Sequence, residues 1–543
     1  MKHHPLMLCA IFFLFFSCKK TDNISANNRQ QTITVNTPSY SNNAINAFGS
    51  LVDTIPPANA VSVKKFGAVG DGTHDDTNDI QAALNSETVL TLPAGTYLIN
   101  NTLNMRPGVK LYGTDGAIIK AGDNMQGTLL SRGMYFYINN TADCLISNIN
   151  FQKSTQPFNL GAWGNACVYI IDSKNIVVNN NVFNFNLPYA KSGLAGVWVS
   201  GSLSANNIIK NNKLTSVGIE YAESGASSTT VDGNYINHAP SDGLSAHGNS
   251  DVYCNYNIVI NNIIENSGLM GIEDWGNVNA TLIKNNTITG VGKDPAQQKD
   301  GIGISAVGIN TRVVSNNITD APIYYIETGG INTIDSNIIN DTQGKAIGII
   351  GNFTGPESKS ATPVRNSNVM TITSDTITGC YRGVVIFGDY SPNVNINNNT
   401  IINPVFIAIN VDSASPSYTI NVSDNKTSFT IPNTQVRKAF ESYTSLKNAH
   451  NQKITLNNNT VTYDAAASGG PGVEYGFEIG TNNTVINANQ FNGNNITAGN
   501  SMVYAISGST TPVSGITLTN NMVYGAVVNL KDFTIKIKSG NNF

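Results

Sequence analysis

The sequence predicts an all-β protein, a right-handed parallel β-helix whose coils are stacked like a solenoid and covered at the N-terminal end by a capping helix. The first observation is an Asn-x-apolar pattern that recurs between residues 181 and 523. The second is a glycine followed by alternating apolar residues, which lies between many of those asparagines. A repeat of about 20–35 residues that carries short strand patterns is typical of a solenoid.

The asparagine pattern predicts one corner of every coil. Stacked coils place each asparagine above the previous one, where the side-chain amides can hydrogen-bond along the stack. The clear instances are Asn181 with Phe183, Asn212 with Leu214, Asn234 with Ile236, Asn262 with Ile264, Asn286 with Ile288, Asn316 with Ile318, Asn399 with Ile401, Asn459 with Val461, Asn489 with Phe491 and Asn521 with Val523.

The first 58 residues predict export and anchoring. Lys2 precedes the apolar stretch 6–16, which is too short to span a bilayer and is typical of a signal peptide. Phe15-Phe16-Ser17-Cys18 resembles a bacterial lipobox, so residues 1–17 are expected to be removed and Cys18 lipidated. An ordinary signal peptide with an incidental cysteine is the alternative. Residues 18–58 are polar and predict a flexible tether, so we expect a membrane-anchored lipoprotein in the periplasm or at the cell surface.

The next block predicts a cap. Residues 63–84 indicate a strand, a glycine-rich turn and a helix that begins near Thr77. Ile80, Ala83 and Leu84 form the apolar face of that helix, and Asp75 and Asp76 favour its N-terminus. Residues 90–99 follow as a strand, a turn and another strand. A solenoid must cover its terminal apolar face, so this block is expected to be structural.

This block resembles the N-terminal segment of the pectate-lyase-like superfamily, which includes the rhamnogalacturonase/epimerase-like domain, some glycoside hydrolases and phage tailspikes. The resemblance covers residues 61–113 at the level of motifs. It implies that residues 59–113 form the cap and residues 114–543 the β-helix. It also implies a carbohydrate-active protein. Asp242-Gly243 and His247-Gly248 are similar to two polygalacturonase motifs, but the Asp-Asp and Arg-Ile-Lys motifs of that branch are missing.

Composition agrees with a polysaccharide partner. Charged residues make up 12% of the chain and the net charge is −4, which leaves no basic field for nucleic acid or an anionic membrane. Cys144, Cys167, Cys254 and Cys380 lack CxxC spacing, so buried free thiols are favoured, with one disulfide as the alternative. The sequence does not indicate the oligomeric state, and a trimer is one of the alternatives.

The remaining chain predicts short strands joined by turns. Longer loops are expected at 156–165, 292–300, 355–368 and 432–452, and residues 436–443 within the last of these are expected to form a short helix. Residues 533–539 predict a final strand.

The glycine-initiated strands predict which side chains share the outer face. The first and third residues after each glycine should point into the coil, and the second and fourth outward. Glu223 and Glu327 are expected on the same side, and Asp242 and Asp300 at its edge. The outward set is Trp198, Ser200, Glu220, Ala222, Ser245, His247, Glu273, Trp275, Gly303 and Ser305.

The favoured hypothesis is a glycoside hydrolase with paired carboxylates. The catalytic candidates are Asp242, Glu273, His247 and Asp274, although the alternation of side chains along the strand directs Asp274 inward. The predicted substrate-binding residues are Trp198, Glu220, Trp275, Asp300 and Glu327, with both tryptophans able to stack on sugars. Adjacent coils lie about 4.8 Å apart, which places Asp242 and Glu273 about 6–9 Å apart. That separation favours inversion, which needs about 6.5–9.5 Å, over retention at about 5–5.5 Å.

Two alternatives stay open. A polysaccharide lyase needs a base and a group that neutralises the uronate carboxylate, for which His247, Lys299, Tyr324 and Arg382 are candidates. No metal site or cofactor is predicted for the hydrolase, but a calcium ion held by Asp242, Glu273 or Asp300 could supply positive charge in a lyase. A non-catalytic glycan-binding or adhesion solenoid is the second alternative.

Overall fold

The computed structural model describes most of the chain after residue 54. The described residues are 55–126, 134–153, 165–189, 194–249, 252–296, 298–329, 331–352, 369–388, 393–413, 419–431, 436–443, 453–463, 474–482, 484–493, 503–508, 513–524, 527–529 and 533–542. The predicted signal peptide, Cys18, most of the tether and nearly all of the loops 156–165 and 355–368 lie outside this set.

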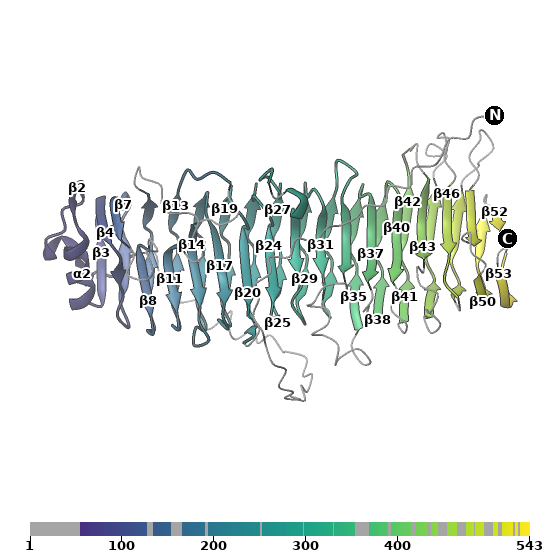
Figure 1. The fold of residues 1–543 in the computed structure, drawn as a ribbon, viewed down its shortest axis with the longest axis horizontal. Coiled ribbons are helices and arrows are strands. Elements are labelled where there is room, and N and C mark those ends of the chain that lie inside the picture. Colours follow the sequence, from purple (N-terminus) through teal and green to yellow (C-terminus); the bar gives the residue numbers. More distant parts are fainter. Residues whose placement is uncertain are drawn as a thin grey trace. The chain divides into compact units, whose positions relative to one another are not determined.

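The described residues from 55 onward belong to one compact unit, Phe48–Phe543, in which successive coils stack as a right-handed parallel β-helix. Most coils contribute one strand to each of three parallel sheets, A, B and C. Sheet A runs from β1 (Val61–Ser62) to β53 (Phe533–Ser539), and sheet B from β2 (Asp71–Asp75) to β51 (Met522–Tyr524). The order of coils follows the sequence (Figure 1). The predicted fold class is confirmed.

Sheet C carries most of the candidate site residues. In spatial order its described strands are β5 (Leu103–Asn104), β8 (Phe136–Asn139), β11 (Ala166–Ile171), β14 (Ala195–Ser200), β17 (Gly218–Glu223), β20 (Leu244–Gly248), β24 (Ile272–Gly276), β28 (Ile302–Ala306), β31 (Tyr324–Thr328), β34 (Ile347–Asn352), β37 (Arg382–Gly388), β40 (Ile407–Ser413), β43 (Arg437–Tyr443), β46 (Glu474–Ile479), β49 (Val503–Gly508) and β52 (Val527–Asn529).

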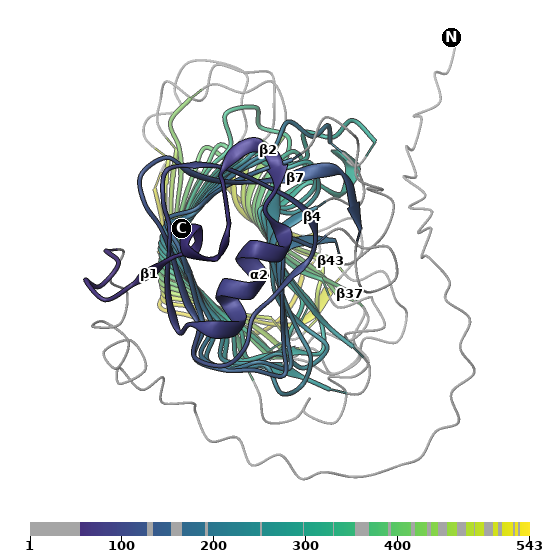
Figure 2. The ribbon, with the colours of Figure 1, turned by 90° about the vertical axis from the view of Figure 1, so that its left-hand side faces the viewer.

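The N-terminal block caps the first coil. Helix α2 (Thr77–Ser86) begins where the sequence predicts, and the backbone N–H of Thr77 donates to Asp75 Oδ1 at 3.1 Å. Ile80, Ala83 and Leu84 are fully buried. Figure 2 shows α2 lying across the end of the coils. The helix therefore covers apolar surface that would otherwise face water at the end of the solenoid.

The asparagines form a hydrogen-bonded ladder at one corner. Asn181 Nδ2 donates to Asn212 Oδ1 at 3.1 Å, and the same bond links Asn234 to Asn262 and Asn262 to Asn286 at 3.0 Å. Each Oδ1 also accepts a backbone N–H from the preceding coil, so one side chain joins three coils. The structure adds Asn337, Asn425, Asn541 and one aspartate, Asp375, to the predicted members.

The apolar partner of each ladder residue points into the coil. Phe183, Leu214, Ile236 and Ile264 pair in register on sheet B and are fully buried. Their neighbours in the coils before and after are likewise apolar, so the core is a continuous column. Burial of this column supplies the main driving force for stacking.

One predicted element is wrong. Residues 437–443 form strand β43 rather than a helix. Its backbone pairs with β40 on one side and β46 on the other, and Ala439 and Phe440 are buried. Tertiary pairing here overrides the helical preference of Ala, Glu and Lys. The predicted final strand is β53, and the four cysteines after Cys18 are free and buried.

In the described part of the chain, no helix has both the length and the apolar character needed to cross a membrane.

Candidate active site

The outer face of sheet C brings the predicted residues into one register column. Trp198 pairs with Glu220, Glu220 with Ser245, Ser245 with Glu273, Glu273 with Ser305 and Ser305 with Glu327. Tyr137 and Tyr169 precede Trp198 in the same column. The rings of Tyr169 and Trp198 lie 6.2 Å apart. The column therefore runs from aromatic side chains into carboxylates.

An irregularity in β17 changes one prediction. Glu220 pairs with Ser245, but Ala222 pairs with Ala246 and Glu223 with His247. The extra residue turns both Tyr221 and Ala222 inward, so the prediction that Ala222 faces outward is wrong. Glu223 takes the outward position, and Trp198 Nε1 donates to its Oε2 at 2.9 Å.

His247 lies between two glutamates. Its Nδ1 is 2.9 Å from Glu220 Oε2 and its Nε2 is 3.0 Å from Glu273 Oε2. Both ring nitrogens face carboxylate oxygens, and only the imidazolium can donate to both. Burial lowers the pKa of His247, but the neighbouring Glu220 and Glu273 outweigh it and hold the pKa well above its ordinary value. The group is therefore a carboxylate–imidazolium–carboxylate bridge across β17, β20 and β24.

Glu220 forms the buried end of this bridge. It is 4% exposed, and Ser245 Oγ donates to its Oε2 at 2.8 Å. Burial raises the pKa of Glu220, while the charge of His247 lowers it in part. Its second oxygen, Oε1, is buried and accepts no hydrogen bond from any described residue.

Asp242 lies in the turn before β20, beside the bridge. The backbone N–H of Met270 donates to its Oδ1 at 3.0 Å. Burial, followed by the charge of Glu273 on the adjacent coil, raises the pKa of Asp242 to about 8. It lines a small pocket of about 50 Å³ together with Trp198, Glu220 and Ser245. The raised pKa makes this carboxyl group a candidate proton donor.

Asp274 is inside the coil and not on the outer face. It is fully buried, the Tyr221 hydroxyl donates to its Oδ1, and Thr311 Oγ1 lies 3.3 Å from its Oδ2. Burial raises its pKa to about 6. The predicted inward direction holds, but a substrate on the outer face does not reach this carboxyl group. We therefore give Asp274 a structural role in place of the predicted catalytic one.

The remaining candidates differ in their exposure and in their position relative to the bridge. The Trp275 side chain is 45% exposed and its ring centre lies 6.4 Å from that of His247, whereas Trp198 is 4% exposed. Glu327 accepts from Asn352 Nδ2 at 3.0 Å and belongs to the same column. Asp300 is exposed at the end of η2 (Gln298–Asp300), outside the His247 bridge.

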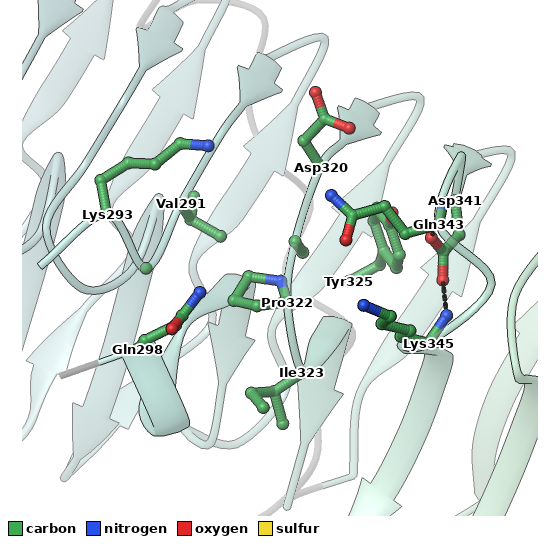
Figure 3. Close-up of a pocket in the computed structure, with 12 residues that line it drawn as sticks. Val291, Lys293, Gln298, Asp320, Pro322, Ile323, Tyr325, Asp341, Gln343 and Lys345 are labelled. Carbon is green, nitrogen blue, oxygen red and sulfur yellow. Dashed lines mark hydrogen bonds between the residues drawn. The ribbon is translucent and has the colours of Figure 1, made fainter. Parts of the chain in front are cut away.

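The sequence did not indicate a larger pocket of about 520 Å³ at the edge where β28, β31 and β34 begin. Figure 3 shows Lys293 and Gln298 on one side of Pro322 and Gln343 and Lys345 on the other. The Asp341 carboxylate there accepts backbone N–H groups from residues 343–346, so it orders a loop. Of the features predicted from the sequence, the loop 292–300 is the one that lines this pocket.

One group of possible metal ligands occurs among the described residues, in the cap. His74, Asp76 and Asp79 place ligand atoms within 4.8 Å of one another. Asp76 Oδ1 already accepts the backbone N–H groups of Val69 and Gly70, at 2.6 and 3.3 Å, so its role is structural. Calcium at Asp242, Glu273 or Asp300 stays a prediction tied to the lyase alternative.

The fold and the site define a class, a parallel β-helix with carboxylates and histidine gathered on one outer face. Residues 60–294 match a family described as rhamnogalacturonase A/epimerase, pectate lyase-like. The matched segment includes α2 and every residue of the His247 bridge. The chain is a right-handed parallel β-helix whose residues 60–294 are similar to this pectate-lyase-like family, the resemblance that its N-terminal block predicts.

Solved structures with a similar fold have different roles. The catalytic unit of a GH87 α-1,3-glucanase from Streptomyces thermodiastaticus is 14% identical, with 88% of this chain and 70% of that chain covered and a TM-score of 0.39. The adhesin PfbA of Streptococcus pneumoniae is 15% identical, with 84% and 91% covered and a TM-score of 0.34. The A-module of mannuronan C-5 epimerase AlgE6 from Azotobacter vinelandii is 12% identical, with 88% and 99% covered and a TM-score of 0.24.

At these values the structural similarities decide nothing about activity. A search of curated proteins found no match.

Proposed function

We propose that this protein is a carbohydrate-active enzyme that hydrolyses a polysaccharide on the outer face of sheet C. The observation that carries the proposal is the contrast between two neighbouring carboxyl groups. The pKa of Asp242 is raised to about 8, whereas Glu273 is hydrogen-bonded to the His247 imidazolium. Glycosidic hydrolysis generally uses two carboxyl groups, one of which donates a proton to the leaving oxygen. The family match supports a carbohydrate substrate.

Each group has a role in this scheme. Asp242 donates its proton to the glycosidic oxygen, so the leaving sugar departs as an alcohol. Glu273 removes a proton from the water that attacks the anomeric carbon, or attacks that carbon itself in a retaining mechanism. His247 orients Glu273 through Nε2 and is held in turn by Glu220. The exposed ring of Trp275 offers a flat apolar surface to a sugar.

Elimination fits the geometry less well. A lyase base must accept a proton, but both nitrogens of His247 already face carboxylates. Tyr324 lies on β31, two coils beyond Glu273, and Arg382 lies on β37, four coils beyond it. The groups that would act together on a uronate are therefore spread along the sheet.

Digestion of a polysaccharide panel with product analysis tests the proposal. The panel contains polygalacturonate, rhamnogalacturonan, arabinoxylan, xyloglucan, β-glucan, α-1,3-glucan and alginate. We expect new reducing ends without the ultraviolet absorption of an unsaturated uronate. Products with that absorption would transfer the assignment to a lyase. A protein that cleaves nothing but still binds one of these polymers would be an adhesion or binding solenoid.

We also propose that Cys18 anchors the mature protein to a membrane through lipid, because its surroundings resemble a lipobox. Cell fractionation tests this. The wild type should be found with membranes, and Cys18→Ser should release the protein or leave it unprocessed. A Cys18→Ser protein that is processed like the wild type and stays in the membrane fraction would exclude lipid anchoring at this residue.

A further inference from the structure

A second polar cluster lies on the outer face of sheet C, well beyond the His247 bridge. It is formed by Arg382, Asn410, Lys438, Glu441 and Glu478, from four consecutive strands, β37, β40, β43 and β46. We call it the distal cluster. Asn410, Glu441 and Glu478 occupy the same register column that carries Glu220 and Glu273 earlier in the sheet.

The members of the distal cluster bind one another in a chain. Arg382 Nη1 donates to Asn410 Oδ1 at 2.9 Å, and Asn410 Nδ2 donates to Glu441 Oε2 at 3.2 Å. Lys438 Nζ contacts Glu441 and lies 2.6 Å from Glu478 Oε2. Burial lowers the pKa of Lys438, but the two glutamates raise it above its ordinary value, so the ammonium group stays charged. These contacts fix the positions of the hydrogen-bond donors and acceptors in the distal cluster.

Two exposed aromatic side chains lie beside the distal cluster. Phe387 is 41% exposed and Tyr443 is 51% exposed. They belong to one outward column, with Asp412 between them, so they lie two coils or about 10 Å apart. Strands β37 and β43 face the same side of the coils in Figure 2. Large apolar side chains exposed beside ordered polar groups indicate a binding surface.

The charges of this region indicate the class of ligand. Arg382 and Lys438 are opposed by Asp412, Glu441 and Glu478, so the surface is close to neutral with a small negative excess. That balance disfavours nucleic acid and other polyanions. Exposed ring faces for apolar surfaces and fixed hydrogen-bonding groups for hydroxyls suit a sugar polymer.

The distal cluster is separate from the candidate active site but in line with it. Strand β37 is four coils beyond β24, about 19 Å, and β43 is six coils beyond it, about 29 Å. In the register column between Glu327 and Asn410 lie Ile350 and Val385, which are apolar and 5% and 2% exposed. A polymer that lies along sheet C reaches both places, whereas a short oligosaccharide reaches one.

We propose that the distal cluster, with Phe387 and Tyr443, is a second polysaccharide-binding site that holds the polymer while another part of it occupies the site at Asp242 and Glu273. The identity of the polymer rests on the proposed function. The binding site itself does not require cleavage, so the two can be tested apart.

Affinity electrophoresis measures binding without catalysis. Glu273→Gln protein runs in gels that contain polygalacturonate, arabinoxylan, xyloglucan, β-glucan or alginate, and we expect at least one polymer to retard it. Adding Phe387→Ala and Tyr443→Ala should weaken retardation by that polymer about tenfold, the loss expected for two aromatic contacts. Tyr524→Ala is the matched control, because Tyr524 is equally exposed, at 51%, but lies on sheet B. All three substitutions replace exposed side chains, so folding should be preserved, and circular dichroism checks it.

The outcomes separate the two proposals. One outcome is that the wild type binds a polymer and cleaves none, with Phe387→Ala and Tyr443→Ala abolishing the retardation. That result supports the second site and contradicts the hydrolase. If the wild type cleaves a polymer, the double variant should raise KM for that polymer about tenfold and leave KM for its trisaccharide unchanged. Unchanged retardation in the double variant, or no retardation of any protein by any polymer, overturns the second site.

Discussion

The asparagine corner and the outer face of sheet C arise from the same stacking of coils, but the two regions use it differently. At the corner, nearly every coil presents the same amide, and each amide satisfies the next. On the outer face the side chains change from coil to coil, and carboxyl groups meet across strands. One buried oxygen, Glu220 Oε1, has no donor among the described residues, and the pKa of Asp242 is raised. The repeated asparagines stabilise the stack of coils, whereas the outer face, where side chains differ from coil to coil, carries the groups that we propose to be reactive.

Asp375 tests that comparison because it places a carboxyl group inside the ladder. Asn337 donates to its Oδ1, but its Oδ2 is buried and has no partner among the described residues. In the next coil the corresponding atom, Asn399 Nδ2, donates to Ile372 O and to Asn425 Oδ1. Oδ2 of Asp375 must therefore carry a proton to act as a donor. Burial raises its pKa to about 7, in agreement.

The largest predicted effect is on stability and follows from this proton. The pKa of Asp375 in the folded protein lies above the unfolded value of 3.8. The contribution of this residue to stability is therefore fully present below pH 3.8 and is lost as the pH rises through about 7. Asp375→Asn supplies a permanent donor. We expect it to stabilise the protein by roughly 3–5 kcal/mol at pH 8 and by much less at pH 4. Denaturant unfolding of both proteins at the two pH values measures this. An equal difference at both would show that Asp375 does not titrate in the ladder.

The next effect concerns an ordinary member of the ladder. Asn262→Ala removes an acceptor for Asn234 and a donor to Asn286 and to Val231 O. The buried groups left without partners should destabilise the protein by about 2–3 kcal/mol. Asn317→Ala, which removes an exposed amide at the start of β30 (Asn317–Thr319), is the control and should cost less. Similar losses for both variants would mean that the ladder adds nothing beyond ordinary corner contacts.

The smallest effect concerns the exposed tryptophan of the outer face. Trp275→Ala should raise KM for a polysaccharide substrate about tenfold with little change in unfolding free energy, because the ring is 45% exposed. Steady-state kinetics and denaturant unfolding measure the two quantities. A large loss of stability with unchanged KM would assign Trp275 to packing.

The regular part of this structure could be predicted from sequence, and the irregular part could not. The spacing of Asn181, Asn212 and Asn234 identifies the coils, and the capping helix follows from its apolar face. The same register correctly brings Glu220, His247 and Glu273 together. It fails at Tyr221 and Ala222, because one extra residue in a strand leaves no mark in an apolar pattern.

The distal cluster was missed for a related reason. Its members come from four strands that are well separated along the chain, and only the pairing of β37 through β46 joins these strands. The interpretation of residues 436–443 as a helix hid Lys438 and Glu441 from the outer face. Local sequence preference could not reveal that two neighbouring strands hold this segment.

The central claim is that Asp242 and Glu273 carry out cleavage. The direct measurement is kcat on the polymer that the panel identifies, for wild type, Asp242→Asn, Glu273→Gln and the control Glu265→Gln, whose carboxylate lies on sheet B beside Tyr235. General acid–base catalysis predicts a loss of about 10²–10⁴-fold for each of the first two variants and unchanged kcat for the control. Wild-type activity in either Asp242→Asn or Glu273→Gln would contradict the account.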